Sequence, residues 1–262
     1  MKADWNPPRA WRLVFTGLSF ALFGLGGLVL RLCCFPLVRL TCSDPLQQRR
    51  RSRLLIYWVF RVFVGFMHRT GVITWHISHP ERLGRPGQMV VANHPSLIDV
   101  VLLISCIRDA NCVVKEGLWH NPFTRGPVQA AGYISNDASV EMIENTAQAL
   151  REGQTLVIFP EGTRTTPGQM PKFHRGASAI AIRGAASVTP VVIRVEPTTL
   201  TKAEPWYSIP DRRVHFSLDV GEPIDPQVYA QNASAPIASR KLDAHLHEYF
   251  IRELTQHERS AS

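Results

Sequence analysis

The sequence predicts an α/β protein in which a mixed, mostly parallel sheet is flanked by helices and preceded by an N-terminal membrane-associated helical segment. Short apolar runs alternate with helix-like segments from Gly71 onward, which is the pattern of strands joined by crossover helices. Several runs are apolar throughout, as strands covered on both faces are. A long uncharged apolar stretch comes first. We therefore expect membrane-associated helices over residues 1–70 and one α/β domain over residues 71–262.

The uncharged stretch covers residues 13–30. As an α-helix it would measure about 27 Å, close to the hydrocarbon thickness of a bilayer. It continues through Arg31 into more apolar sequence, which favours a retained anchor over a cleaved signal peptide. More positive charges follow it than precede it, so a transmembrane helix in the cytoplasmic (inner) membrane would leave the C-terminal domain facing the cytoplasm. A helical hairpin inserted into one leaflet fits the same sequence.

A basic cluster of Arg49, Arg50, Arg51 and Arg53 precedes an aromatic stretch at residues 54–71. Basic ends on an apolar helix suit a membrane interface. An ordinary core helix has the same periodicity, so both interpretations stay open. The large apolar side chains of the stretch are Trp58, Phe60, Phe63, Phe66 and Met67.

The α/β region contains six runs that we expect to form strands, followed by a C-terminal helix. The runs are residues 72–77, 88–93, 111–115, 155–160, 187–195 and 213–220. The clearest helix between them covers residues 139–151, with Gly153 as its stop and Val140, Ile143, Ala147 and Leu150 as its apolar stripe. In the tail, Leu242, Leu246, Tyr249, Phe250 and Leu254 follow a helical period and should face inward.

Composition restricts the classes of partner. The formal charge of +8 and the pI of about 9.6 indicate an anionic partner. Nucleic acid is not expected, because the basic residues lie beside apolar segments and the strands carry no aromatic stacking pattern. The five cysteines have no C-x-x-C spacing, so we interpret them as reduced packing residues and expect no metal site.

His94 and Asp99 form the first candidate site, in the sequence "NHPSLID". Pro95 and Ser96 favour a helix start, which would place His94 between a strand and a helix and Asp99 in the first or second turn. Asp99 would then fix one ring nitrogen of His94 and leave the other free as a general base. A purely structural capping pair would have the same spacing. The chain has no G-x-S-x-G elbow, so the base would activate a substrate hydroxyl or amine.

The stretch "FPEGTRT", which begins at Phe159, forms the second candidate site, because it follows a buried strand and ligands bind at such strand ends. Glu161 can fix a neighbour, Gly162 allows close backbone approach, and the guanidinium of Arg164 suits a phosphate. A surface turn with a Glu161–Arg164 pair is the alternative. Lys172 lies in "KFHRGA", where a helix start offers a further anion site.

The chain resembles the glycerolipid acyltransferases of the 1-acylglycerol-3-phosphate (lysophosphatidic acid) acyltransferase family. The resemblance covers residues 88–194 and four motifs. Its H-x4-D (HX4D) motif matches His94 and Asp99, and its "FPEGTR" motif matches residues 159–164 in full, including Thr163. The two remaining motifs resemble Lys115, Leu118, Pro122, Gly126 and Gly132 in the middle of the domain, and residues 188–193 around Pro190.

The resemblance implies a membrane-associated O-acyltransferase of phospholipid biosynthesis, acting on lysophospholipid at the bilayer surface. His94 would be the catalytic base and Asp99 its orienting partner. Glu161, Gly162, Thr163, Arg164, Lys115 and Lys172 would bind the acceptor. Acyl-CoA or acyl-carrier protein would be the donor, with no other cofactor. Backbone N–H groups near the helix start would stabilise the oxyanion.

One departure from the family keeps other functions open. Many members carry an Arg shortly after the last Gly of the middle motif, where this chain has Ser135, Asn136 and Asp137. Arg125 or Lys115 would then have to supply the charge, or the acceptor is another lipid-like molecule, such as an amine or a specialised polyketide-type product. A catalytically silent membrane-binding protein is the alternative outside the enzymes.

Overall fold

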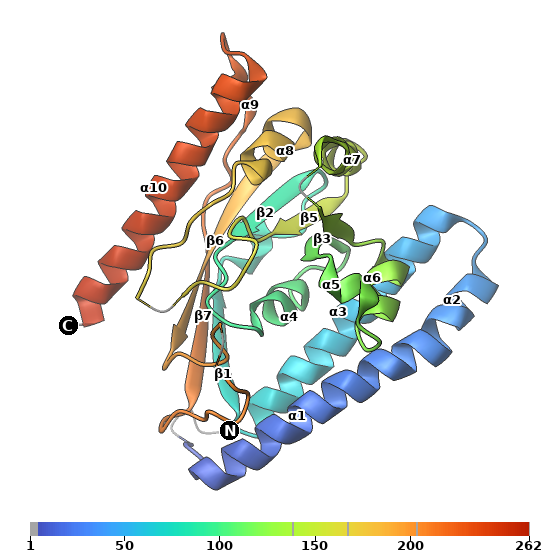
Figure 1. The fold of residues 1–262 in the computed structure, drawn as a ribbon, viewed down its shortest axis with the longest axis vertical. Coiled ribbons are helices and arrows are strands. Elements are labelled where there is room, and N and C mark those ends of the chain that lie inside the picture. The colour runs from blue at the N-terminus through green and yellow to red at the C-terminus, as the bar shows by residue number, and fades with distance from the viewer. Residues whose placement is uncertain (1–4, 138, 167, 203, 262) are drawn as a thin grey trace.

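The computed structural model describes residues 5–137, 139–166, 168–202 and 204–261. Its strands are β1 (Ile73–Ser78), β2 (Gln88–Ala92), β3 (Ala110–Lys115), β4 (Ile134–Asn136), β5 (Thr155–Ile158), β6 (Ser187–Glu196) and β7 (Val214–Val220). They form one sheet in the order β1-β7-β6-β2-β5-β3-β4 (Figure 1). Every neighbouring pair is parallel except β6 and β7. The mixed, mostly parallel sheet of the sequence prediction is confirmed.

All six predicted strands are present, but the sequence interpretation missed β4. This strand has only three residues and pairs with the end of β3. It was missed because its residues, Ile134, Ser135 and Asn136, contain neither an apolar run nor a full alternation of apolar and polar positions.

Helices cover both faces of the sheet. The long N-terminal helices are α1 (Arg9–Val29), a π-helical turn η1 (Leu30–Cys34), α2 (Phe35–Thr41) and α3 (Pro45–Arg69); the others are the 3-10 turn η2 (Pro80–Arg82), α4 (Asp99–Ile104), α5 (Gly117–His120), α6 (Arg125–Ala131), α7 (Val140–Arg151), α8 (Gly176–Gly184), α9 (Gln227–Ala230) and α10 (Ala235–Ala261). One apolar core joins α3, α4 and α6 to one sheet face. A second core joins α7, α8 and α10 to the other.

The N-terminal helices form a hairpin along the side of the domain (Figure 1). Residues 9–41 are one continuous helix, long and apolar enough to cross a membrane by length and composition. It is fastened to the domain near both ends of its apolar stretch. The guanidinium of Arg12 donates hydrogen bonds to the carbonyls of Pro210, Asp211 and Arg212, and Nη1 of Arg31 donates to the carbonyl of Pro122.

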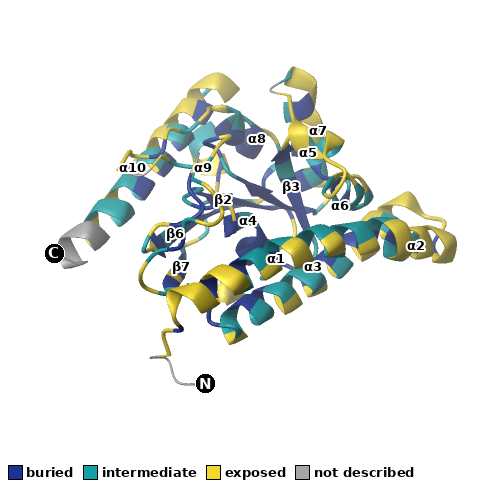
Figure 2. Cartoon of the chain, turned by 60° about the horizontal axis from the view of Figure 1, so that its bottom comes forward, coloured by how far each residue is buried: buried dark blue, intermediate teal, exposed yellow. Residues whose placement is uncertain are grey.

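The outer face of the hairpin is an exposed apolar stripe (Figure 2). Its exposed side chains recur every three or four residues, which is one face of a helix. They are Trp11, Val14, Leu18, Leu22, Leu25, Val29 and Leu32 on the first helix, and Leu54, Trp58 and Val62 on α3. A contiguous apolar patch of this kind marks an interaction surface.

Helix α3 combines the two interpretations that the sequence left open. Ile56, Val64 and Met67 are buried in the core, whereas Trp58 and Val62 are exposed. The core-helix interpretation therefore holds for the inner face of α3, and its outer face remains available to an interface. Each helix of the hairpin buries one side against the domain and leaves the other side exposed.

Arg53 corrects the sequence interpretation of the basic cluster. Its side chain is 1% exposed, against the expectation of a membrane-facing charge. Nε donates to the carbonyl of Ala131, and Nη1 donates to Oε1 of Gln154 and lies 3.5 Å from Oδ1 of Asp109. Arg53 therefore joins α3 to the α/β domain.

We expect Arg53→Ala to destabilise the protein by about 3–5 kcal/mol, because the substitution leaves a cavity and buried acceptors without partners. Arg51 is the matched control, since it lies two residues away on the same helix and is exposed. Arg51→Ala should change the free energy of unfolding by less than about 0.5 kcal/mol. Chemical denaturation of both variants in detergent measures the difference. Equal stability of the two variants would contradict the structural role of Arg53.

The sequence predicted the buried faces of α10 and α7, and the structure confirms the first and partly contradicts the second. On α10, Leu242, Leu246 and Phe250 are buried as predicted. On α7 the predicted stripe is partly wrong, because Val140 is 83% exposed and Met142 is buried instead. The side chain of Ser139 caps the N–H of Met142, and this start turns Val140 outward.

Candidate active site

The predicted site residues gather at one edge of the sheet. Strands β2, β5, β3 and β4 are neighbours and parallel, so their carboxyl ends lie at the same edge. His94 follows β2, Lys115 ends β3, Asn136 ends β4, and the loop at residues 159–165 follows β5. This is the edge at which open α/β sheets bind ligands.

His94 and Asp99 are in contact. Nδ1 of His94 lies 3.1 Å from Oδ2 of Asp99, and the same oxygen accepts the backbone N–H of Ser96 at 2.7 Å. The side chain of His94 is 16% exposed, whereas that of Asp99 is fully buried. An ionised Asp99 keeps the hydrogen on Nδ1, so Nε2 is left with an open lone pair.

The turn before α4 differs from the prediction in one respect. Helix α4 begins at Asp99, so Pro95 and Ser96 precede it. Oδ2 of Asp99 closes the turn by accepting the N–H of Ser96, three residues earlier, as a side chain in the first turn of a helix does when it reaches back to the preceding backbone. The turn therefore brings Asp99 within hydrogen-bonding distance of Nδ1 of His94.

Burial perturbs both carboxylates of the site. Desolvation raises the pKa of Asp99, and the hydrogen bond from His94 opposes this effect. Desolvation also raises the pKa of Glu161, and the hydrogen bonds that it accepts from the backbone of His94 and from Thr165 oppose it. Perturbed carboxylates at a strand edge are typical of functional sites.

The ion pair between Glu161 and Arg164, which the alternative interpretation of a surface turn required, is absent from the described contacts. Oε1 of Glu161 accepts the backbone N–H of His94 at 2.9 Å and the hydroxyl of Thr165 at 2.8 Å. Nη1 of Arg164 donates to the carbonyls of Leu200 and Thr201, both at 2.8 Å. Glu161 therefore fixes the backbone at His94, and Arg164 attaches the loop to residues 200–201.

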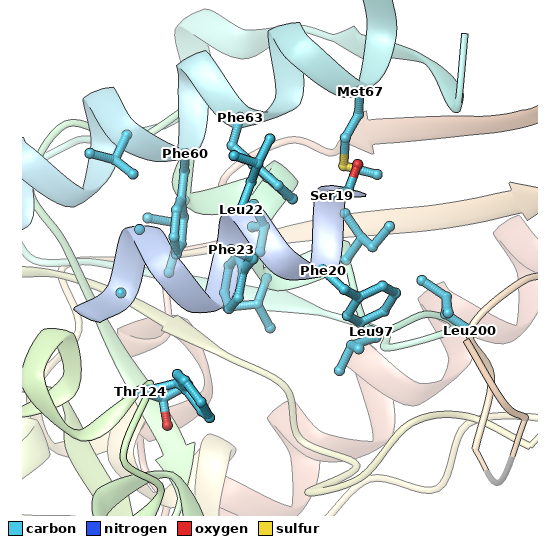
Figure 3. Close-up of a pocket in the computed structure, with 18 of the residues that line it drawn as sticks. Ser19, Phe20, Leu22, Phe23, Phe60, Phe63, Met67, Leu97, Thr124 and Leu200 are labelled. Atoms are coloured by element: carbon cyan, nitrogen blue, oxygen red, sulfur yellow. The ribbon is translucent and has the colours of Figure 1, made fainter. Parts of the chain in front are cut away.

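A cavity of about 380 Å³ opens beside His94 and is mostly apolar (Figure 3). Its walls come from α1, α3, α4 and the loop at residues 199–210. Figure 3 shows Phe20, Phe23 and Phe60 pointing into it from the hairpin. The volume lies in the range of small-molecule sites. The hairpin therefore supplies one wall of a chamber whose other wall carries the His–Asp pair.

Glycine allows the hairpin to approach the domain closely at two points. A Cβ at Gly27 would lie 2.4 Å from the carbonyl oxygen of Phe123, and a Cβ at Gly126 would lie 2.6 Å from Cβ of Arg31. Neither contact is possible for a larger residue without movement. These approaches hold residues 117–131 against α1, beside the mouth of the cavity.

Lys115 and Asn136 lie side by side, whereas Lys172 is elsewhere. Lys115 is the register partner of Asn136 across β3 and β4. A Cβ at Gly162 would lie 3.8 Å from Nδ2 of Asn136, so these strand ends adjoin the loop at residues 159–165. Lys172 lines a different cavity, against α10. The sequence analysis grouped Lys172 with the other site residues because they are close in the chain. It could not predict that α10, which is distant in the chain, forms a separate cavity with Lys172.

The structure gives contacts to three residues whose individual roles the sequence did not assign. The ring of Phe159 lies against the imidazole of His94 with centroids 4.6 Å apart. The hydroxyl of Thr165 donates to Glu161, and its N–H donates to the carbonyl of His94 at 2.7 Å. The carbonyl of Leu200 accepts from both Leu97 and Arg164. Phe159 and Thr165 lie in the stretch that the sequence predicted as the second candidate site, whereas no sequence signal indicated Leu200.

A family model described as Acyltransferase matches residues 75–194, which are somewhat less than half of the chain and contain His94, Asp99 and the loop at residues 159–165. The chain is similar to the 1-acyl-sn-glycerol-3-phosphate acyltransferase of Cocos nucifera, with 27% identity over 53% of this chain and 51% of the relative. The enzyme of the same name from Pseudomonas aeruginosa is 26% identical over 51% and 52% of the two chains.

A solved structure shows the same fold. The 1-acyl-sn-glycerophosphate (LPA) acyltransferase of Thermotoga maritima matches 93% of this chain and 98% of its own, with a TM-score of 0.69 and 20% identity. The chain spans about half the length of the curated relatives named above. The comparisons therefore give the fold of the chain and a match of its central region to an acyltransferase model.

Proposed function

We propose that this protein transfers an acyl group from a thioester donor to the free hydroxyl of 1-acyl-sn-glycerol-3-phosphate. One observation carries the proposal: His94 lies on the wall of an apolar cavity, and its Nδ1 is hydrogen-bonded to the buried Asp99. The named activity of the relatives supports the choice of acceptor. A structural capping pair would not require a cavity beside its histidine.

In the proposed reaction, Nε2 of His94 removes the proton from the acceptor hydroxyl. The oxygen forms a bond to the thioester carbonyl carbon, and the C–S bond then breaks. The proton on His94 passes to the leaving thiolate, which restores the neutral imidazole. Asp99 stabilises the transient imidazolium and fixes its tautomer.

Two backbone N–H groups that precede α4 are already hydrogen-bonded. The N–H of Ser96 donates to Asp99, and the N–H of Leu97 donates to the carbonyl of Leu200 at 3.2 Å. In the proposed reaction, these two groups can therefore stabilise an oxyanion only by giving up those bonds.

The acyl chain fits the apolar cavity, and the hairpin fits a membrane surface. The apolar stripe of the hairpin faces away from the domain (Figure 2), while the inner side lines the cavity. Because Arg12 and Arg31 fasten the first helix along the domain, we propose insertion into one leaflet in preference to a full crossing. A lipid chain could then enter the cavity without passing through water.

Arg164 and Lys115 are the proposed holders of the acceptor phosphate. Among the described residues, Arg164 uses only Nη1 for protein contacts, which leaves Nη2 and Nε for a phosphate. Lys115 ends the neighbouring strand and is exposed. It lies where a positive charge can compensate for Asn136.

We expect Arg164→Lys to raise the KM for the acceptor by about ten-fold or more, because Lys cannot make a bidentate contact. The KM for the donor should change less than two-fold. Steady-state kinetics with each substrate varied in turn measures both values. A larger change in the donor KM would instead assign Arg164 to the thioester side. Arg183→Lys is the control, since Arg183 lies on α8 outside the described site.

The proposed function is tested by acyl transfer in vesicles that contain 1-acyl-sn-glycerol-3-phosphate, with labelled acyl-CoA and acyl-carrier protein as alternative donors. The expected product carries two acyl chains on one glycerol phosphate. If neither donor gives this product, the assignment of the acceptor is wrong. A parallel set of lipid amines and neutral lipid alcohols is included because Asn136 stands where many family members carry Arg.

A further inference from the structure

A second cavity, of about 490 Å³, is formed by the segment before α8 and by one side of α10. Its lining residues are Lys172, Phe173, Arg175, Arg240, Asp243, Ala244 and His247. We call this cavity the basic cleft, since three of these side chains carry a fixed positive charge and only one is acidic.

The cations of the basic cleft have no protein partners among the described residues. No ion pair or side-chain hydrogen bond joins Lys172, Arg175 or Arg240 to another described residue. The acid, Asp243, accepts a hydrogen bond from the hydroxyl of Ser178 at 3.3 Å. Three unpaired cations around one cavity repel one another, so an anion that enters the cleft gains from all three.

The basic cleft adjoins the His–Asp site through the backbone. The N–H of His174 donates to the carbonyl of Pro160 at 2.9 Å. A Cβ at Gly162 would lie 3.6 Å from Cδ2 of His174. The residue before His174 and the residue after it line the cleft, while Glu161 on the other side holds the backbone of His94. A ligand in the cleft therefore lies one loop away from the reacting atoms.

The position of the basic cleft favours a water-soluble ligand over a lipid headgroup. Helices α8 and α10 belong to the core on one face of the sheet, and α3 belongs to the core on the other. Figure 1 shows α10 and the N-terminal hairpin on opposite sides of the molecule. If the hairpin meets the bilayer, the cleft opens toward water.

We propose that the basic cleft binds the phosphate groups of coenzyme A as part of the acyl donor. The inference rests on the proposed function. In an acyl-CoA, the pantetheine arm separates the thioester from the adenosine phosphates, so a phosphate site must lie apart from His94. The volume suits a nucleotide. The half-buried ring of Phe173, whose centroid lies 6.0 Å from that of His247, offers an aromatic edge to the base.

Calorimetric titration with adenosine 3′,5′-bisphosphate tests the cleft without any catalytic step. We expect the wild type to bind it and the double variant Arg175→Gln/Arg240→Gln to lose about ten-fold or more in affinity. Lys241→Gln is the matched control, because Lys241 follows Arg240 on α10 but does not line the cleft. Lys241→Gln should bind as the wild type does. Absence of binding to the wild type would overturn the proposal.

Kinetics then separates the cleft from the reaction centre. With acyl-CoA, the double variant should show a KM raised by about ten-fold or more. With the acyl thioester of N-acetylcysteamine, which has no phosphate, its kcat/KM should stay within about two-fold of the wild type. Equal losses with both donors would overturn the proposal.

Failure of the proposed function and failure of the coenzyme A proposal give different results. If the wild type transfers an acyl group from neither donor, the proposed function is wrong, and the titration alone still shows whether the basic cleft binds the nucleotide. If the double variant loses transfer only from acyl-carrier protein, and the wild type does not bind the nucleotide, the cleft recognises a protein donor and the coenzyme A assignment is wrong.

Discussion

His94→Ala is expected to lower kcat for acyl transfer by about 10²–10⁴-fold, which is the usual contribution of a general base. The imidazole supplies the only described ring nitrogen that both lines the apolar cavity and is oriented by a buried carboxylate. The loss should appear in kcat, because the acyl chain and the phosphate are held by other residues. Single-turnover transfer with saturating donor measures it.

The control for this experiment is His245→Ala. His245 is exposed on α10, so its removal should leave both activity and unfolding temperature unchanged. The unfolding temperature of His94→Ala should fall, because the buried carboxylate of Asp99 loses a hydrogen bond. Transfer is therefore measured below the unfolding transition of the variant. Full activity in the folded His94→Ala variant would reject the general-base role and would favour the catalytically silent membrane-binding protein.

The sheet was predictable because buried parallel strands have continuous apolar runs. Strands β2, β5 and β6 consist mainly of apolar residues, most of them buried, so their continuous apolar runs indicated strands. The faces of helices were less predictable. Arg53 was expected at the surface, because a sequence does not reveal that Ala131 and Gln154 would converge on its guanidinium. Burial of a charge depends on tertiary partners that lie far away in the chain.

The site shows the same division between local and distant information. The contact of His94 with Asp99 follows from a spacing of five residues and a turn, and both are local. The carbonyl of Leu200, which accepts from Arg164, lies on a loop whose path depends on the whole sheet. The shape of the cavity depends on how α1 packs relative to α4, and no single sequence motif predicts this packing. Chemistry was therefore easier to predict than the chamber that surrounds it.

Asp99→Asn should separate activity from stability. Oδ2 of Asp99 meets both the N–H of Ser96 and Nδ1 of His94, so the amide oxygen of Asn can take this place and accept from both. The variant then keeps the tautomer of His94 but loses the negative charge that stabilises the imidazolium. We expect kcat to fall by about 10²–10³-fold, which is the usual effect of removing one electrostatic contact to a charge that develops in the transition state.

The stability of the same variant should depend on pH in a defined direction. Burial raises the pKa of Asp99, so the folded protein binds this proton more tightly than the unfolded chain does. The contribution of Asp99 to stability therefore falls as pH rises from the ordinary range of an aspartate to its raised value. Above that window the buried carboxylate opposes folding, and the neutral amide of Asn does not. Asp99→Asn should accordingly be at least as stable as the wild type at neutral pH, and its advantage should vanish in acid.

Asp137→Asn provides a contrast with the opposite sign. Asp137 is exposed, and its hydrogen bonds with Ser139 lower its pKa, so its carboxylate contributes stability above the ordinary aspartate range and loses it as pH falls. Thermal melts of both variants across pH 3–8, each paired with the transfer assay, measure the two trends. An Asp99→Asn protein that is less stable than the wild type at neutral pH would show that the carboxylate holds the turn before α4 together. In that case the loss of activity could not be assigned to the missing charge beside His94.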